Sequence, residues 1–137
     1  MANSYTFLLI SDDLPQVVAC KHEFATRAKV ISAHLRLVPD AISAMSYISG
    51  FEHYSDRLAF PIPDLILCDV HLAKVDGIQF FHWLHQQSRP CPGDIPFMFI
   101  CGDDTPVNRR QMAMNAGATQ VLDKPVDWRD FFDELLK

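Results

Sequence analysis

Five short apolar runs alternate along this chain with five segments of helical periodicity. The runs are YTFLLI at 5–10, HLRLV at 34–38, DLILCD at 64–69, IPFMFIC at 95–101 and QVL at 120–122. Short runs rich in aliphatic and aromatic residues, bounded by turn residues, are typical of buried strands. The alternation predicts an α/β domain, because parallel strands connected by helices are covered on both faces of their sheet.

The segments between the runs carry the end signals of helices. The first is predicted to begin at Leu14, with Asp13 as its N-cap and Pro15 in its first turn, where a missing N–H costs nothing. Its apolar stripe is Leu14, Val17, Val18, Phe24, Ala25 and Ala28. The other helices are predicted at 40–49 (closed by Gly50), 76–88, from Thr105–Pro106 to Gly117, and 127–137. Residues 51–63 are expected to form a longer connection and 89–94 a loop.

This order of elements predicts a flavodoxin-like (βα)5 fold, a doubly wound sheet of five parallel strands in the order 2-1-3-4-5. A chain of 137 residues fits one domain, here taken as 1–137. In such sheets ligands bind at the carboxyl ends of the strands, where the strand order reverses. That position lies between the first and third strands.

Charged and polar residues follow several of the predicted strands at this edge. Asp12 and Asp13 follow the first strand, Asp69 ends the third, Cys101 ends the fourth and Lys124 follows the fifth. Three clustered carboxylates repel one another unless a cation joins them, and oxygen ligands suit Mg²⁺. A carboxylate beside Mg²⁺ and a lysine is a reasonable nucleophile toward a phosphoryl group. Taken singly, the first two aspartates are explained as helix caps and the lysine as a solvated charge, but their coincidence at three strand ends favours a site.

Three motifs carry a resemblance to a known family. They are LLISDDLP, LILCDVHLAKVDG, with a glycine eight residues after Asp69, and AGATQVLDKP. In this order and spacing, over residues 5–136, the chain resembles the receiver domain of two-component response regulators of the chemotaxis-regulator type.

The resemblance implies a role for each matched residue. Asp69 would accept a phosphoryl group from a histidine kinase or a histidine phosphotransfer protein. Asp13 and Asp69 would bind Mg²⁺ directly, together with the backbone carbonyl of His71. Asp12 would act partly through water, and Lys124 would pair with the phosphate.

Two positions depart from the family pattern. Cys101 stands where the family has Thr or Ser, whose hydroxyl donates to the phosphoryl group, and a thiol is a weaker donor. Val121 stands where the family has its switch aromatic. These departures leave the acceptor chemistry in place and predict an atypical output switch. The resemblance also implies a cis peptide bond between Lys124 and Pro125.

Composition excludes some classes of partner and site. A net charge of −5 offers no basic footprint for nucleic acid. No apolar run approaches the roughly 20 residues that span a bilayer, and MANSYTFLLI lacks signal-peptide features, which predicts a cytoplasmic protein. The four cysteines form no C-x-x-C pair, so neither a zinc site nor a disulfide framework is indicated: Cys20, Cys68, Cys91 and Cys101.

Several other side chains suggest functional roles, but a structural explanation is preferred for each of them. A strand-end thiol at Cys101 near Lys124 suggests redox activity, whereas nearby carboxylates oppose it. His82 and His85 form a possible metal pair without an evident third ligand. The last helix is rich in large apolar residues that either cover the sheet or form a partner or homodimer face: Trp128, Phe131, Phe132, Leu135 and Leu136.

The predicted function is a non-enzymatic signalling domain that acts through a downstream protein or a fused output domain. The main alternative is a receiver-like binding module that works without phosphorylation, suggested by Cys101 and Val121. A small phosphatase with Asp69 as nucleophile is disfavoured, because His71 occupies the position of the second acid. No Gly-x-Gly-x-x-Gly follows the first strand, so dinucleotide binding is excluded.

Overall fold

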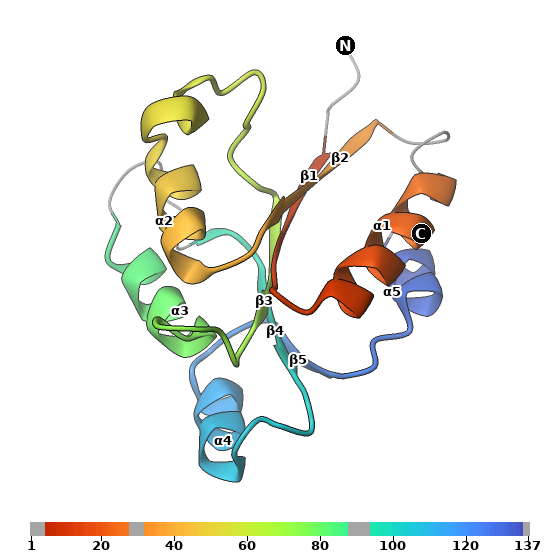
Figure 1. The fold of residues 1–137 in the computed structure, drawn as a ribbon, viewed down its shortest axis with the longest axis vertical. Coiled ribbons are helices and arrows are strands. Elements are labelled where there is room, and N and C mark those ends of the chain that lie inside the picture. Colours follow the sequence, from red (N-terminus) through yellow and green to blue (C-terminus); the bar gives the residue numbers. More distant parts are fainter. Residues whose placement is uncertain (1–4, 28–31, 88–93, 136–137) are drawn as a thin grey trace.

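A computed structural model describes residues 5–27, 32–87 and 94–135 (Figure 1). Its five strands are β1 (Tyr5–Ile10), β2 (Ala33–Val38), β3 (Leu65–Asp69), β4 (Phe97–Cys101) and β5 (Gln120–Asp123). They form one sheet in the order β2-β1-β3-β4-β5, and every pair is parallel. The predicted fold class and strand order are therefore confirmed.

Helices cover both faces of this sheet (Figure 1). Those on one face are α1 (Leu14–Arg27) and α5 (Trp128–Leu135), and those on the other are α2 (Ala41–Ser49), α3 (Gly77–His85) and α4 (Val107–Asn115). A short 3-10 helix, η1 (Glu52–Ser55), lies in the connection between α2 and β3. The sheet thus separates two hydrophobic cores.

The two cores follow from the alternation of side chains along each strand. In β1, Phe7 and Leu9 face the α1–α5 side, where they pack with Trp128 and Phe132. Leu8 and Ile10 face the opposite side and belong to the core beneath α2 and α3. Because both faces are buried, the strands read as continuous apolar runs rather than as an alternating pattern.

Most element boundaries differ from the predicted ones by one or two residues. The fourth strand begins at Phe97 rather than at Ile95, since Pro96 has no N–H for the ladder. The third helix ends at His85 and the last at Leu135. Residues 89–93 of the loop predicted at 89–94, which include Cys91, lie outside the described residues, as do Ala28, Ser88, Leu136 and Lys137.

The predicted apolar stripe of α1 is wrong in part. Leu14 and Val18 are 72% and 64% exposed, whereas the buried residues of the helix are Gln16, Cys20 and Phe24. These three are four residues apart and share one helix face. The pattern was misread because one member of the buried face is a polar glutamine.

The predicted helix ends are confirmed in two cases and wrong in one. Asp13 caps α1 by accepting from the N–H of Gln16, and Gly50 ends α2 with a left-handed φ of 68°. Thr105 does not cap α4, which begins two residues later. Its hydroxyl instead accepts from the N–H of Gly102 at 3.1 Å and so tightens the turn after β4.

Candidate functional site

Asp69 lies at the end of the central strand of the sheet and is 1% exposed. The start of α3 packs directly against it. A Cβ on Gly77 would stand 2.3 Å from the carbonyl oxygen of Asp69, and the N–H of Gly77 donates to the carbonyl of Val70 at 2.9 Å. Glycine is therefore required here by the close approach of helix and strand.

Both carboxylate oxygens of Asp69 accept hydrogen bonds. The hydroxyl of Ser11 donates to Oδ2 at 2.6 Å, and the amide Nε2 of Gln16 donates to Oδ1 at 2.8 Å. The ammonium of Lys124 lies 3.3 Å from Oδ2. A buried carboxylate needs such partners, because burial of an unpaired charge is strongly unfavourable.

The topology explains how Ser11 and Gln16 reach Asp69. Ile10, the last residue of β1, is paired with Cys68, so Ser11, which follows it, is level with Asp69. Gln16 lies in the first turn of α1, three residues after Asp13, and its Nε2 also donates to the hydroxyl of Ser11 at 3.0 Å. Sequence reasoning missed both residues. The strand register was the available signal for Ser11, and a polar residue on the buried face of α1 was the signal for Gln16.

Lys124 joins Asp69 to a second carboxylate. Its Nζ donates to Oδ2 of Asp13 at 3.0 Å, and the peptide bond to Pro125 is cis, as the resemblance implied. Gly102 leaves room for the lysine, because a Cβ there would stand 3.1 Å from the lysine Cδ. The ends of β1, β3 and β5 therefore bring together two carboxylates and one ammonium.

Burial and charge shift the pKa values of these three groups in different directions. Burial raises the pKa of Asp69, against the hydrogen bonds from Ser11 and Gln16 and the charge of Lys124. The hydrogen bond from Lys124 lowers the pKa of Asp13. Burial works to lower the pKa of Lys124, but the two carboxylates outweigh it and the pKa is raised. Lys124 is therefore cationic. Of the three charges, the ionised form of the buried Asp69 is the one that its surroundings disfavour.

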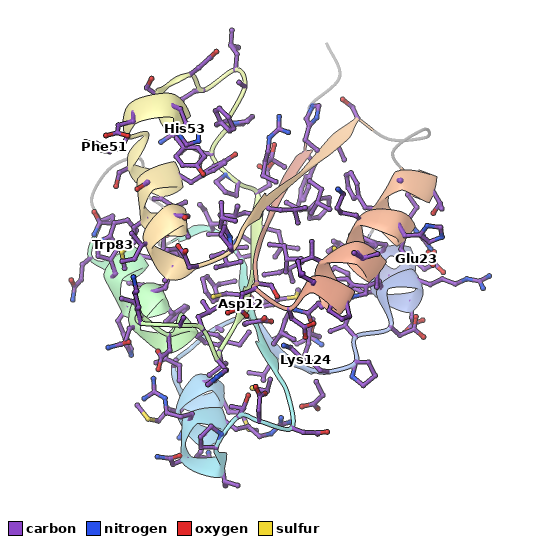
Figure 2. All side chains as sticks on the ribbon, viewed as in Figure 1. Asp12, Glu23, Phe51, His53, Trp83 and Lys124 are labelled. Carbon is purple, nitrogen blue, oxygen red and sulfur yellow. The ribbon has the colours of Figure 1, made fainter. Side chains whose placement is uncertain are left out.

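A cleft of about 550 Å³ opens beside this cluster, and Asp13, Gln16, Gly102 and Lys124 are among the residues that line it. Figure 2 shows Asp12 and Lys124 at the same end of the sheet, on the segments that follow β1 and β5. Gln16 and Lys124 line the cleft and also contact the buried Asp69, so they stand between the cleft and the acidic side chain.

Comparison with known families identifies the family to which the chain belongs. The sequence pattern of the response regulator receiver domain matches residues 8–136. The chain belongs to the family of response regulator receiver domains of two-component signalling. The matched range includes the buried aspartate that ends β3, the acidic residue after β1 and the lysine after β5.

Two curated proteins are similar to part of this chain. BceR, a sensory transduction protein of Bacillus subtilis, is 31% identical over 93 residues, which cover 64% of this chain and 37% of that protein. GraR, a response regulator protein of Staphylococcus epidermidis, is 28% identical over 78 residues, covering 57% of this chain and 32% of that protein. The matched regions are thus about a third of the length of these relatives.

Solved structures share the fold at lower identity. The phosphorylated cyanobacterial phytochrome response regulator RcpA matches with a TM-score of 0.76 and 19% identity, over 97% of this chain and 89% of that one. The Mn²⁺-bound form of response regulator Rcp1 matches with a TM-score of 0.76 and 21% identity, over 96% and 88% of the two chains.

Two further residues predicted for the site, one through water and one through its backbone carbonyl, have exposed side chains. Asp12 is exposed, and within the described residues no hydrogen bond or ion pair joins it to Asp69 or Lys124. His71 is exposed on the loop after β3. In the described ranges no three His, Cys, Asp or Glu side chains form a metal-binding group. The structure therefore brings two of the three predicted carboxylates together.

Cys101 and Val121, the two residues that the sequence predicts to alter the output switch, are both at least partly buried. Cys101 is 1% exposed, and burial raises the pKa of its thiol. A buried, protonated thiol is the opposite of a reactive one, so the redox interpretation has no support from the geometry. Val121 is half-buried against the core beneath α3, where a valine has no ring to turn outward.

The remaining candidates have structural explanations. Nδ1 of His85 lies 2.9 Å from the carbonyl oxygen of Phe81, one turn earlier on α3, and His82 is exposed. In the last helix Trp128 and Phe132 are buried in the core. None of the helices within the described ranges is long and apolar enough to cross a membrane.

Proposed function

We propose that this receiver domain accepts a phosphoryl group on Asp69 and passes the signal on through protein–protein contacts. The observation that carries the proposal is the cluster of one buried carboxylate with a shared ammonium. Lys124 contacts both Asp69 and Asp13, at the sheet edge where ligands of such folds bind. A fixed ammonium beside a carboxylate nucleophile neutralises charge on a transferring phosphoryl group.

The donor phosphoryl group is proposed to come from the phosphohistidine of a histidine kinase or a phosphotransfer protein. A carboxylate oxygen of Asp69 attacks phosphorus, and the bond from phosphorus to the imidazole nitrogen breaks. The electron pair of that bond leaves with the imidazole, and an aspartyl phosphate remains. The ammonium of Lys124 stays paired with the phosphoryl oxygens throughout.

The oxygen atoms of the site fit Mg²⁺. Oδ2 of Asp13 and Oδ2 of Asp69 both lie within 3.3 Å of one lysine nitrogen, so a single cation already joins the two carboxylates. Asp13 and Asp69 would hold the metal with the carbonyl of His71, and Asp12 would act through water. When bound, the metal supplies further neutralisation of phosphoryl oxygens.

Partners and location extend this proposal. We expect a kinase or phosphotransfer protein upstream, and a downstream protein or fused output domain, in the cytoplasm and without direct contact to nucleic acid.

The face of α5 and β5 is the proposed contact surface, as a homodimer or with another protein. Phe131 and Leu135 are only half-buried there, and they line a groove together with Leu122 and Val126. The single-domain organisation of 1–137 is part of the same proposal.

Intact-mass measurement tests the acceptor directly. The purified chain is incubated with Mg²⁺ and acetyl phosphate, and the gain of one phosphoryl group is expected for the wild type. Asp69→Asn should gain none. Asp130→Asn, an exposed carboxylate on α5, is the matched control and should behave as wild type. Uptake by Asp69→Asn would refute the assignment.

The second candidate is a binding module that works without phosphorylation. It is favoured by the burial of Asp69, whose two carboxylate oxygens are already hydrogen-bonded, and by the replaced switch residues Cys101 and Val121. No phosphoryl uptake by the wild type, together with partner affinity that Asp69→Asn leaves unchanged, would select this function over the first.

A further inference from the structure

The amide of Gln16 is a polar group on the reacting carboxylate that neither binds a metal nor carries charge. Its side chain reaches Asp69 from α1, and the residue is 8% exposed. We infer that Gln16 shortens the lifetime of the aspartyl phosphate by stabilising the free carboxylate more than the phosphorylated one. This inference rests on the proposed function of Asp69 as acceptor.

The two oxygens of Asp69 have different surroundings. Oδ2 accepts from Ser11 at 2.6 Å and lies 3.3 Å from the ammonium of Lys124, which lines the cleft. Oδ1 accepts from Nε2 of Gln16 at 2.8 Å. The cation therefore marks Oδ2 as the oxygen that takes the phosphoryl group, while Oδ1 becomes the carbonyl oxygen of the acyl phosphate.

The amide is held in a fixed orientation by Ser11. Nε2 of Gln16 donates both to Oδ1 of Asp69 and to the hydroxyl of Ser11, at 2.8 and 3.0 Å. The same hydroxyl accepts from the backbone N–H of Asp13 at 3.2 Å and donates to Asp69. Both hydrogens of the amide nitrogen are thus used, and the donor stays aimed at Oδ1.

The strength of the Gln16 hydrogen bond changes with the charge of its acceptor. In the free carboxylate Oδ1 carries part of a negative charge, and hydrogen bonds to ionised groups are roughly twice as strong as neutral ones. In the acyl phosphate Oδ1 is a neutral carbonyl oxygen. When water attacks phosphorus, its oxygen joins the phosphoryl group, which leaves as inorganic phosphate, and its protons stay with the phosphate or pass to solvent. The electron pair of the broken bond from phosphorus to Oδ2 stays on the aspartate, and the charge on Oδ1 returns. The amide therefore favours hydrolysis and opposes phosphoryl uptake.

Gln16→Met tests this role, because methionine is unbranched, similar in length and has no N–H to donate. Wild type and variant are phosphorylated with acetyl phosphate and Mg²⁺, the donor is removed, and loss of the phosphoryl group is followed by intact mass. We expect the variant to hold its phosphoryl group on the order of fivefold to tenfold longer, with uptake no slower than in the wild type. Gln111→Met, on the exposed side of α4, is the control and should match the wild type.

Each outcome decides the matter. Equal or shorter lifetimes in Gln16→Met would overturn the inference and leave the acceptor role of Asp69 standing. No uptake by the wild type would overturn the proposed function and the inference with it. If circular dichroism shows that Gln16→Met does not fold, Gln16→Asn replaces it. Its amide is one methylene too short to keep the contact, and the same longer lifetime is expected.

Discussion

Two helices beside β5, on opposite faces of the sheet, are attached by different interactions. On α5 Trp128 and Phe132 are buried, and the ring of Phe132 contacts those of Phe7 and Phe24 at centroid distances of 5.9 and 5.7 Å. These edge-on contacts join α5 to β1 and α1 through apolar surface. Arg27 of α1 also pairs with the exposed Asp133 of α5, but the apolar contacts supply most of the attachment and do not depend on salt.

The attachment of α4 is mainly electrostatic. Of its nine residues Ala113 alone is buried, whereas Val107, Met112 and Met114 are exposed. Arg109 pairs with Asp76 at the start of α3, and Arg110 pairs with Asp123 at the end of β5. Exposed or half-exposed ion pairs contribute little and are screened by salt. The helix is therefore expected to open locally at low free-energy cost.

The two helices also differ in how their neighbouring segments contribute to the site. Ser11, Gln16 and Asp13, which contact Asp69 or Lys124, come from the end of β1 and from α1, the helix packed on α5. Cys101 leads instead into the loop before α4. The surroundings of the proposed acceptor thus come mainly from the tightly packed layer, and we expect local opening to be easier in α4.

The largest expected effect is on the tight layer. Phe132→Ala removes a fully buried ring and should lower the free energy of unfolding by about 3–5 kcal/mol. Met114→Ala, on the exposed face of α4, should change it by less than about 0.5 kcal/mol. Urea unfolding followed by circular dichroism measures both. Similar losses in the two variants would contradict the distinction between the helices.

The sequence predicted the fold and the main charges of the site for reasons visible in single residues. The strands were found because burial on both faces makes them continuous apolar runs. Asp69 and Lys124 were found because they directly follow such runs, and parallel strands place these ends together. Asp12, the other residue of the acidic pair, is exposed, and its predicted role through water stays a prediction.

The parts that sequence did not predict depend on interactions between distant elements. Gln16 is buried because it meets Asp69, which is 53 residues away, and its polar side chain therefore broke the apolar stripe of α1. The hydroxyl of Thr105 bonds to the N–H of Gly102 rather than capping α4. Local propensity depends only on a residue's neighbours in sequence. The burial of Gln16 and the hydrogen bond of Thr105 depend instead on tertiary contacts.

A smaller effect on the free energy of unfolding is expected from the ionisation of the buried Asp69. Burial raises the pKa of Asp69 above that of an unfolded aspartate, so the neutral form is favoured by folding. The associated stability is present below the ordinary aspartate pKa of about 3.9 and is lost as pH rises through the raised value. Asp69→Asn stays neutral and does not lose it.

The test is the difference in free energy of unfolding between Asp69→Asn and wild type, measured by urea unfolding from acid to neutral pH. We expect this difference to grow in favour of the variant as pH rises, by less than the effect of Phe132→Ala. Asp130→Asn, on the exposed side of α5, should show no such trend. A difference that is constant with pH would mean that the hydrogen bonds of Ser11, Gln16 and Lys124 offset burial in full.

The smallest effect on stability should come from the ion pair of α4. Arg109→Ala removes its contact with Asp76 and should lower the free energy of unfolding by at most about 1 kcal/mol. Its effect on local opening should be larger in proportion, because the pair is one of the few attachments of the helix. Hydrogen exchange is therefore expected to quicken for the amides of α4 and to stay unchanged for those of α5. High salt should do the same to the wild type, and Arg129→Ala on the exposed side of α5 should leave both helices as they were. If α5 responded as strongly as α4, the two helices would form one cooperative unit, and the loosely attached element would have to be sought elsewhere.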